Sequence, residues 1–68
     1  MVNRLKQTRE YQQITQEQLA QMVGVSRQSI ISVEKGHYVP TSVLALKISF
    51  ALKMKVEDLF ILESTDWK

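Results

Sequence analysis

The chain has 68 residues, no cysteine and one histidine, with hydrophobic residues at 44% and charged residues at 24%. These numbers suit one ordinary globular domain, and they exclude disulfides, cysteine-ligated metal sites, thiol nucleophiles and a histidine-rich metal centre. A domain of this size buries only about 60% of the surface that its unfolded chain exposes, so we expect a second copy of the chain to add stability.

Charge is unevenly distributed along the chain. Residues 1–56 hold eight basic and three acidic side chains, a net charge of +5, whereas residues 57–68 hold one basic and four acidic side chains, a net charge of −3. A basic body followed by an acidic end is compatible with a polyanionic partner, although a solvated surface with scattered charges has the same pattern. No apolar run approaches the roughly 20 residues of a membrane span, and the N-terminus lacks a signal-peptide pattern. We therefore expect a cytoplasmic protein that does not associate with membranes.

Apolar residues recur at intervals of three and four rather than two, which predicts an all-α domain. A first helix is expected from about Asn3, as its N-cap, to Tyr11 or Gln12. A second helix is expected after Thr15, because the Thr-x-x-Gln sequence that starts there is a capping box, and it should end at Gly24.

Serine and threonine caps mark the next two helices. Ser26 caps a third helix from Arg27 to Lys35, which Gly36 ends, and Thr41 caps a fourth.

The end of the chain is predicted to hold a short fifth helix, from Val56 to about Leu59 or Phe60. After it, residues 60–64 could extend as a strand and pair with residues 1–3.

The segment 15–36 has the features of a helix-turn-helix. The small residue Ala20 stands where the two helices must cross, and Gly24 accepts the positive φ that the turn requires. Ile30 and Val33 are apolar anchors at the middle of the second helix and a turn later. Each feature is common by chance, but together at this spacing they strongly indicate the motif.

The outward side of the third helix carries the groups that nucleic acid can use. A projection at 100° per residue puts an amide, a hydroxyl, an ammonium and an apolar tip together, with a guanidinium at their edge. These groups match base edges, thymine methyls and phosphates, although a polar helix face is more often simply solvated. The preceding turn favours DNA reading here. The residues of this reading face are Arg27, Gln28, Ile31, Ser32 and Lys35.

With these motifs the chain resembles the lambda-repressor-like, or XRE, helix-turn-helix family. The likeness rests first on residues 16–20, 24–30 and 34–36. Within the family the chain is most similar to small stand-alone repressors, which have five helices with a small terminal β-sheet and bind palindromic operators as homodimers. Further matches lie at residues 40–41, 51–52 and 56–60, so that the resemblance covers about nine-tenths of the chain.

The resemblance implies two kinds of DNA contact. Contacts to base edges are implied for Arg27, Gln28 and Ser32, beside which Ile31 offers its apolar tip. Contacts to the sugar-phosphate backbone are implied for Gln16, Ser29, Lys35, His37 and Tyr38.

The resemblance also implies a partly buried ion pair between Arg9 and Glu34, which ties the first helix to the end of the third. Two departures from the family pattern concern turns. Gln13 stands where many relatives have glycine, and Lys53 stands where asparagine or glycine is usual, so these turns could differ.

The predicted function is a sequence-specific DNA-binding transcriptional regulator, a repressor that binds a palindromic operator in double-stranded DNA as a homodimer. An antitoxin or adaptor that uses the same fold to bind another protein is the alternative. No general base or oxyanion device accompanies Ser26, Ser29 and Ser32, so they are not nucleophiles and we expect no enzyme. We also expect no cofactor and no metal.

Dimerisation is expected through the C-terminal part of the chain, about residues 56–68. This part is acidic, yet it is too apolar for an unstructured end. The alternative is that its tryptophan packs back on its own subunit. The residues expected at the dimer contact are Phe60, Ile61, Leu62 and Trp67.

Overall fold

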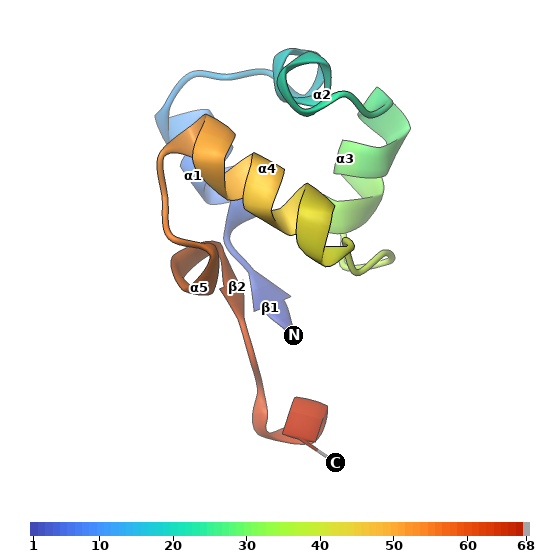
Figure 1. Cartoon of the computed structure of the whole chain (residues 1–68), viewed down its shortest axis with the longest axis vertical. Coiled ribbons are helices and arrows are strands. Elements are labelled where there is room, and N and C mark those ends of the chain that lie inside the picture. Colours follow the sequence, from blue (N-terminus) through green and yellow to red (C-terminus); the bar gives the residue numbers. More distant parts are fainter. Residues whose placement is uncertain (68) are drawn as a thin grey trace.

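The computed structural model describes residues 1–67, in which a two-stranded sheet joins the ends of a helical body (Figure 1). The strands β1 (Val2–Asn3) and β2 (Phe60–Ile61) are antiparallel, with Val2 opposite Ile61. Together with the sheet, the helices confirm the expected five-helix fold. The α-helices are α1 (Leu5–Tyr11), α2 (Gln16–Val23), α3 (Arg27–Glu34), α4 (Ser42–Leu52) and α5 (Val56–Leu59).

Three helices begin at the caps that the sequence predicts. The hydroxyl oxygens of Thr15, Ser26 and Thr41 each accept a hydrogen bond from the backbone N–H three residues later, at 3.0, 3.2 and 3.2 Å. At α2 the capping box is complete, because Oε1 of Gln18 accepts the backbone N–H of Thr15 at 2.8 Å. Local chemistry therefore sets the start of both helices of the helix-turn-helix.

The prediction that Asn3 is the N-cap of the first helix is wrong. Arg4 occupies that position without a side-chain capping bond, and Asn3 belongs to β1. Its side chain still accepts the backbone N–H of Leu5 at 3.3 Å, and its amide donates to the Val33 carbonyl at 2.9 Å. Pairing of β1 with β2 holds Asn3 extended, so the helix begins only at Leu5.

Two turns keep a left-handed backbone although they lack glycine. Gln13 has φ 60° before α2, and Lys53 has φ 56° at the end of α4. Gly24, which ends α2, has φ 74°. The departures from the family pattern therefore leave the turn geometry in place, at a cost of about 1–2 kcal/mol for each side chain.

The core lies between all five helices, and each of them contributes at least one buried apolar side chain. The positions predicted to point inward from the helix-turn-helix are buried. Burial of each large side chain contributes on the order of 1.5–3 kcal/mol. The core residues are Leu5, Leu19, Ala20, Val23, Ile30, Val33, Leu44, Ile48, Leu52 and Leu59.

The C-terminal segment, residues 60–67, begins with β2 beside α5 and then extends away from the helices (Figure 1). Its strand is shorter than predicted, because the chain turns into a 3-10 helix at Ser64–Trp67. The indole of Trp67 is 76% exposed, so the alternative that it packs on its own subunit is wrong for this chain. Lys68, the last residue of the expected dimerisation segment, lies outside the described residues.

Ionic contacts hold the C-terminal segment to the N-terminus. The Met1 ammonium lies 3.0 Å from an Asp66 carboxylate oxygen and 3.1 Å from a Glu63 carboxylate oxygen. Hydrogen bonds to these carboxylates, Asp66 first, raise the pKa of the Met1 ammonium. A hydrogen bond from the backbone N–H of Glu63, followed by one from the ammonium, lowers the pKa of Asp66. All these contacts are exposed to solvent, so they position the segment without burying it.

Candidate nucleic-acid interface

The packing of α2 against α3 fixes the orientation of the reading face. Ala20 is buried where the two helices cross, and its carbonyl accepts the backbone N–H of Val25 at 3.0 Å across the turn. Ile30 and Val33 are buried under α3. Because these anchors occupy one side of the helix, the opposite side must face outward.

The predicted reading residues lie on that outward side, but they differ in how far their side chains are exposed to solvent. Arg27, Gln28 and Lys35 are exposed, whereas Ile31 and Ser32 are half-buried. The helical projection therefore identified the outward side of α3. The two half-buried side chains can reach a ligand only if it comes close to the helix.

One hollow on the surface opens over the reading face. It has a volume of about 340 Å³ and is lined by Gln28, Ser29, Ser32 and Tyr38. The hydroxyl of Ser29 lies 3.1 Å from that of Ser26, within hydrogen-bonding distance. The fold thus joins residues of α3 to the loop after it, as a contact to one ligand would require.

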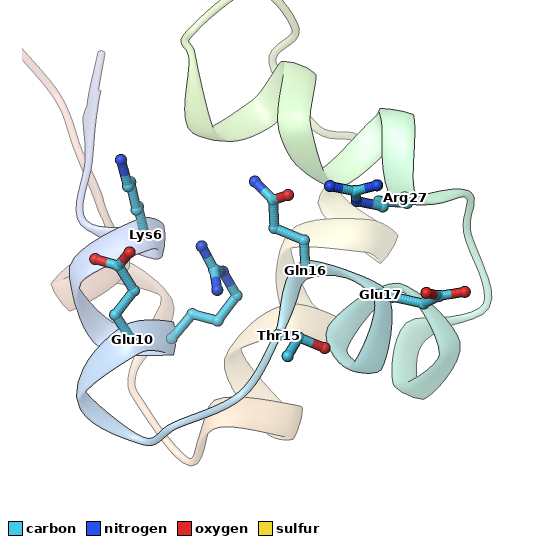
Figure 2. Close-up of a pocket in the computed structure, with 7 residues that line it drawn as sticks. Lys6, Glu10, Thr15, Gln16, Glu17 and Arg27 are labelled. Carbon is cyan, nitrogen blue, oxygen red and sulfur yellow. The ribbon is translucent and has the colours of Figure 1, made fainter.

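A second hollow of about 550 Å³ lies beside the first residues of α2 and α3. Figure 2 shows Gln16 and Arg27 on one side of it and Lys6 and Glu10 of α1 on the other. The two predicted residues, one from each helix of the motif, therefore line the same hollow. The remaining lining residues are Arg9, Thr15 and Glu17.

Sequence reasoning did not predict two contacts of this region. Lys6 adds a cation to the second hollow, and its spacing of three residues from Arg9 was a signal that both share one face of α1. Asn3 ties β1 to α3 through the Val33 carbonyl. The contact between Asn3 and Val33 joins residues far apart in the sequence, so no local pattern predicts it.

A buried ion pair braces the interface from behind. Nε and Nη2 of Arg9 donate to the two carboxylate oxygens of Glu34 at 2.7 and 3.3 Å, and Nη1 donates to the Ile14 carbonyl at 2.8 Å. The amide of Gln16 also donates to Glu34, at 3.1 Å. The charged side chains of the pair are only 9% and 4% exposed. Such a network is better evidence for fixed geometry than for net stability.

Three of the predicted contact residues line neither hollow. Ile31 and Lys35 lie on α3, and His37 follows in the loop, where its backbone N–H donates to the Ser32 carbonyl at 3.0 Å. Lys35 and His37 are exposed. These residues could contact a ligand only where it extends beyond the hollows.

None of the helices within residues 1–67 has the length and apolar composition that a bilayer crossing needs. In the same part of the chain, no three carboxylate or imidazole side chains gather as metal ligands would.

Comparison with known proteins agrees with this geometry. Residues 5–59 match the helix-turn-helix family. An uncharacterised HTH-type transcriptional regulator of Methanocaldococcus jannaschii is 48% identical over 66 residues, which cover 97% of this chain and 100% of that protein. YgzD of Bacillus subtilis, also an uncharacterised HTH-type transcriptional regulator, is 49% identical over 63 residues, or 93% and 96% of the two chains.

A solved structure shows the same fold. The restriction-modification controller protein C.AhdI from Aeromonas hydrophila superimposes with a TM-score of 0.79 at 33% identity, over 84% of this chain and 86% of its own. The expected resemblance to the XRE family is confirmed. The chain therefore belongs to the helix-turn-helix family and is a transcriptional regulator with a helix-turn-helix DNA-binding domain of the XRE type.

Proposed function

We propose that the protein is a sequence-specific repressor that binds a palindromic operator as a homodimer in the cytoplasm. The single observation that carries this proposal is which side chains of α3 are buried and which lie at the surface. Ile30 and Val33 lock one side of the helix into the core, and on the other side the side chains of Gln28 and Ser32 line a surface hollow. A rigid helix that presents polar side chains at the surface is what reading a major groove demands.

Direct reading of bases is assigned to residues near the middle and start of α3. The amide of Gln28 suits adenine N6 and N7, and the guanidinium of Arg27 suits guanine O6 and N7. Ser32 can serve as donor or acceptor, and Ile31 can meet a thymine methyl group. Because Ile31 and Ser32 are half-buried, these contacts require α3 to enter the groove deeply.

Contacts to the backbone of the DNA are assigned to the residues around the reading face. Gln16, which Glu34 braces, would hold one phosphate, and Ser29 would hold another. Lys35 and the loop residues His37 and Tyr38 would follow the same strand. These contacts orient the protein and carry little sequence information.

The homodimer is assigned to the C-terminal segment. Phe60 and Ile61 are half-buried in the monomer, whereas Leu62 and Trp67 are exposed. A symmetric contact there would cover these side chains and hold two α3 helices at a fixed separation. The operator half-sites should then lie about 10–10.5 base pairs apart, or a multiple of that distance. A dimer seated on such an operator represses by occupying DNA that the polymerase needs.

The test begins with selection of bound sites from a random DNA library. On the selected operator, Gln28→Ala and Ser32→Ala should each weaken binding by roughly 1–3 kcal/mol and relax the preference at particular bases. Lys35→Ala should instead weaken binding to all sequences alike and reduce the salt slope by about one unit. Identical effects of all three changes on operator and random DNA, or selection of an asymmetric site, would contradict the proposal.

A further inference from the structure

The helix α4 has apolar side chains on both of its sides. Leu44 and Ile48 point into the core and are buried. On the other side Val43, Leu46 and Phe50 are exposed, Phe50 to 88%. An apolar helix face is normally covered, so the exposure of these three side chains needs an explanation of its own.

The outer side of α4 forms one wall of a hollow of about 930 Å³, whose other wall is the end of α2. We call the side chains of Met22, Val43, Leu46 and Phe50 the apolar groove. The hollow shares no lining residue with the two hollows at the DNA interface. A ligand in the apolar groove therefore does not compete with DNA for the same side chains.

The charges beside the groove are of one sign. Lys47 and Lys53 line the hollow, and none of its lining residues is acidic. A second copy that presented the same groove would bring four ammonium groups together without a carboxylate, which opposes association. The acidic groups of the C-terminal segment are no better candidates, because Glu63 and Asp66 already contact the Met1 ammonium. The complementary occupant is apolar with acidic flanks.

The spacing of the exposed residues indicates the shape of this occupant. Val43, Leu46 and Phe50 follow the i, i+3, i+7 pattern of one helical stripe, and Met22 faces them from the neighbouring helix. A groove between two helices accepts an amphipathic helix with apolar anchors. We propose that the apolar groove docks an amphipathic helix of another protein, whose carboxylates flank its apolar anchors and pair with Lys47 and Lys53.

The test uses a panel of synthetic amphipathic helices of about 14 residues, with leucine and phenylalanine anchors and glutamates on both flanks. Each peptide has a matched control in which lysine replaces every glutamate. Titration of the full chain, followed by amide chemical shifts, should show binding of a glutamate peptide with shifts centred on Met22, Leu46 and Phe50. The lysine version should bind at least about tenfold more weakly.

Variants of the full chain distinguish peptide binding in the groove from nonspecific hydrophobic binding. Phe50→Ser should weaken peptide binding at least about tenfold, because it removes the most exposed anchor of the groove. Tyr11→Ser is the matched control, since Tyr11 is 89% exposed but lies outside the groove. Lys47→Glu should reverse the preference between the two peptide versions. Operator binding should be unchanged in Phe50→Ser, which distinguishes failure of this proposal from failure of the proposed DNA function.

Three outcomes would overturn the proposal. One is equal binding of the glutamate and lysine peptides, and another is no binding by any peptide of the panel. The third is a wild-type oligomer in light scattering that Phe50→Ser alone disperses, because a second copy would then cover the groove.

Discussion

The helix-turn-helix and the C-terminal segment differ in the burial of their apolar side chains. In α3, Ile30 and Val33 are fully covered, and behind the interface Arg9 and Glu34 bond each other away from solvent. In the C-terminal segment Trp67 stays exposed, and the ionic contacts lie in water. One region is thus complete within a single chain, whereas the other presents surface that a second molecule can cover. A reading face must be rigid before it meets DNA, but a dimer contact needs only to become rigid on assembly.

The largest effect is expected from breaking the buried ion pair. Glu34→Ala leaves the Arg9 guanidinium buried without its partner and removes the brace of Gln16. The free energy of unfolding in urea should fall by about 3–5 kcal/mol. Glu17→Ala, an exposed acid on α2, is the control and should change stability by less than about 0.5 kcal/mol. A loss as small in Glu34→Ala as in the control would mean that the network does not hold the region together.

The next effect concerns the cap of the reading helix. Ser26→Ala removes the hydroxyl that accepts the backbone N–H of Ser29, so stability should fall by about 1 kcal/mol, within the range 0.5–2. Ser42→Ala is the matched change at an exposed serine at the start of α4. Thermal unfolding followed by circular dichroism compares the two variants. If both shift the midpoint equally, the cap at Ser26 contributes nothing specific.

A stabilising change is expected at the strained turn after α4. Lys53→Gly removes the side chain from a residue with φ 56° and should raise the free energy of unfolding by roughly 1 kcal/mol. Lys53→Ala removes the same charge but keeps the Cβ atom, so it should not stabilise the protein. Urea unfolding distinguishes backbone strain from charge, and equal stabilisation by both variants would assign the effect to the charge.

In the C-terminal segment, removal of a large side chain should leave the stability of the monomer almost unchanged. Trp67→Ser should alter stability by less than about 0.5 kcal/mol in dilute solution, because the indole is exposed. At higher concentration the unfolding midpoint of the wild type should rise with protein concentration, as expected for a homodimer. Trp67→Ser and Leu62→Asp should abolish that rise. A midpoint of the wild type that is independent of concentration would argue against the proposed dimer.

The smallest effect is the pH dependence of the contact between the two ends of the chain. Because the pKa of the Met1 ammonium is raised, the contact persists below the ordinary value of 8.0 and is lost as pH rises through the raised value. Because the pKa of Asp66 is lowered, the contact persists above 3.8 and is lost as pH falls through the lowered value. The indole N–H shift of Trp67 should report both steps. Acetylation of the N-terminus should remove the alkaline step, and its survival would place the titrating group elsewhere.

Much of the fold and of the interface could be predicted because the rules that govern them act within one or two helical turns. The caps at Thr15, Ser26 and Thr41 and the outward side of α3 follow from residue type and spacing alone. The exposure of Gln28 on this side was therefore predictable before any packing was known.

The features that sequence reasoning missed depend on residues far apart in the chain. The start of α1 was misplaced because β1 pairs with β2 near the other end, and Asn3 bonds a carbonyl thirty residues away. The place of Lys6 across the hollow from Gln16 depends on how α1 packs against the motif. Periodicity shows that α4 is apolar, but only packing decides that Phe50 stays outside. Local chemistry thus determined the helices and the outward side of α3. Only the tertiary structure decided which apolar surfaces are covered, because burial depends on which helices meet.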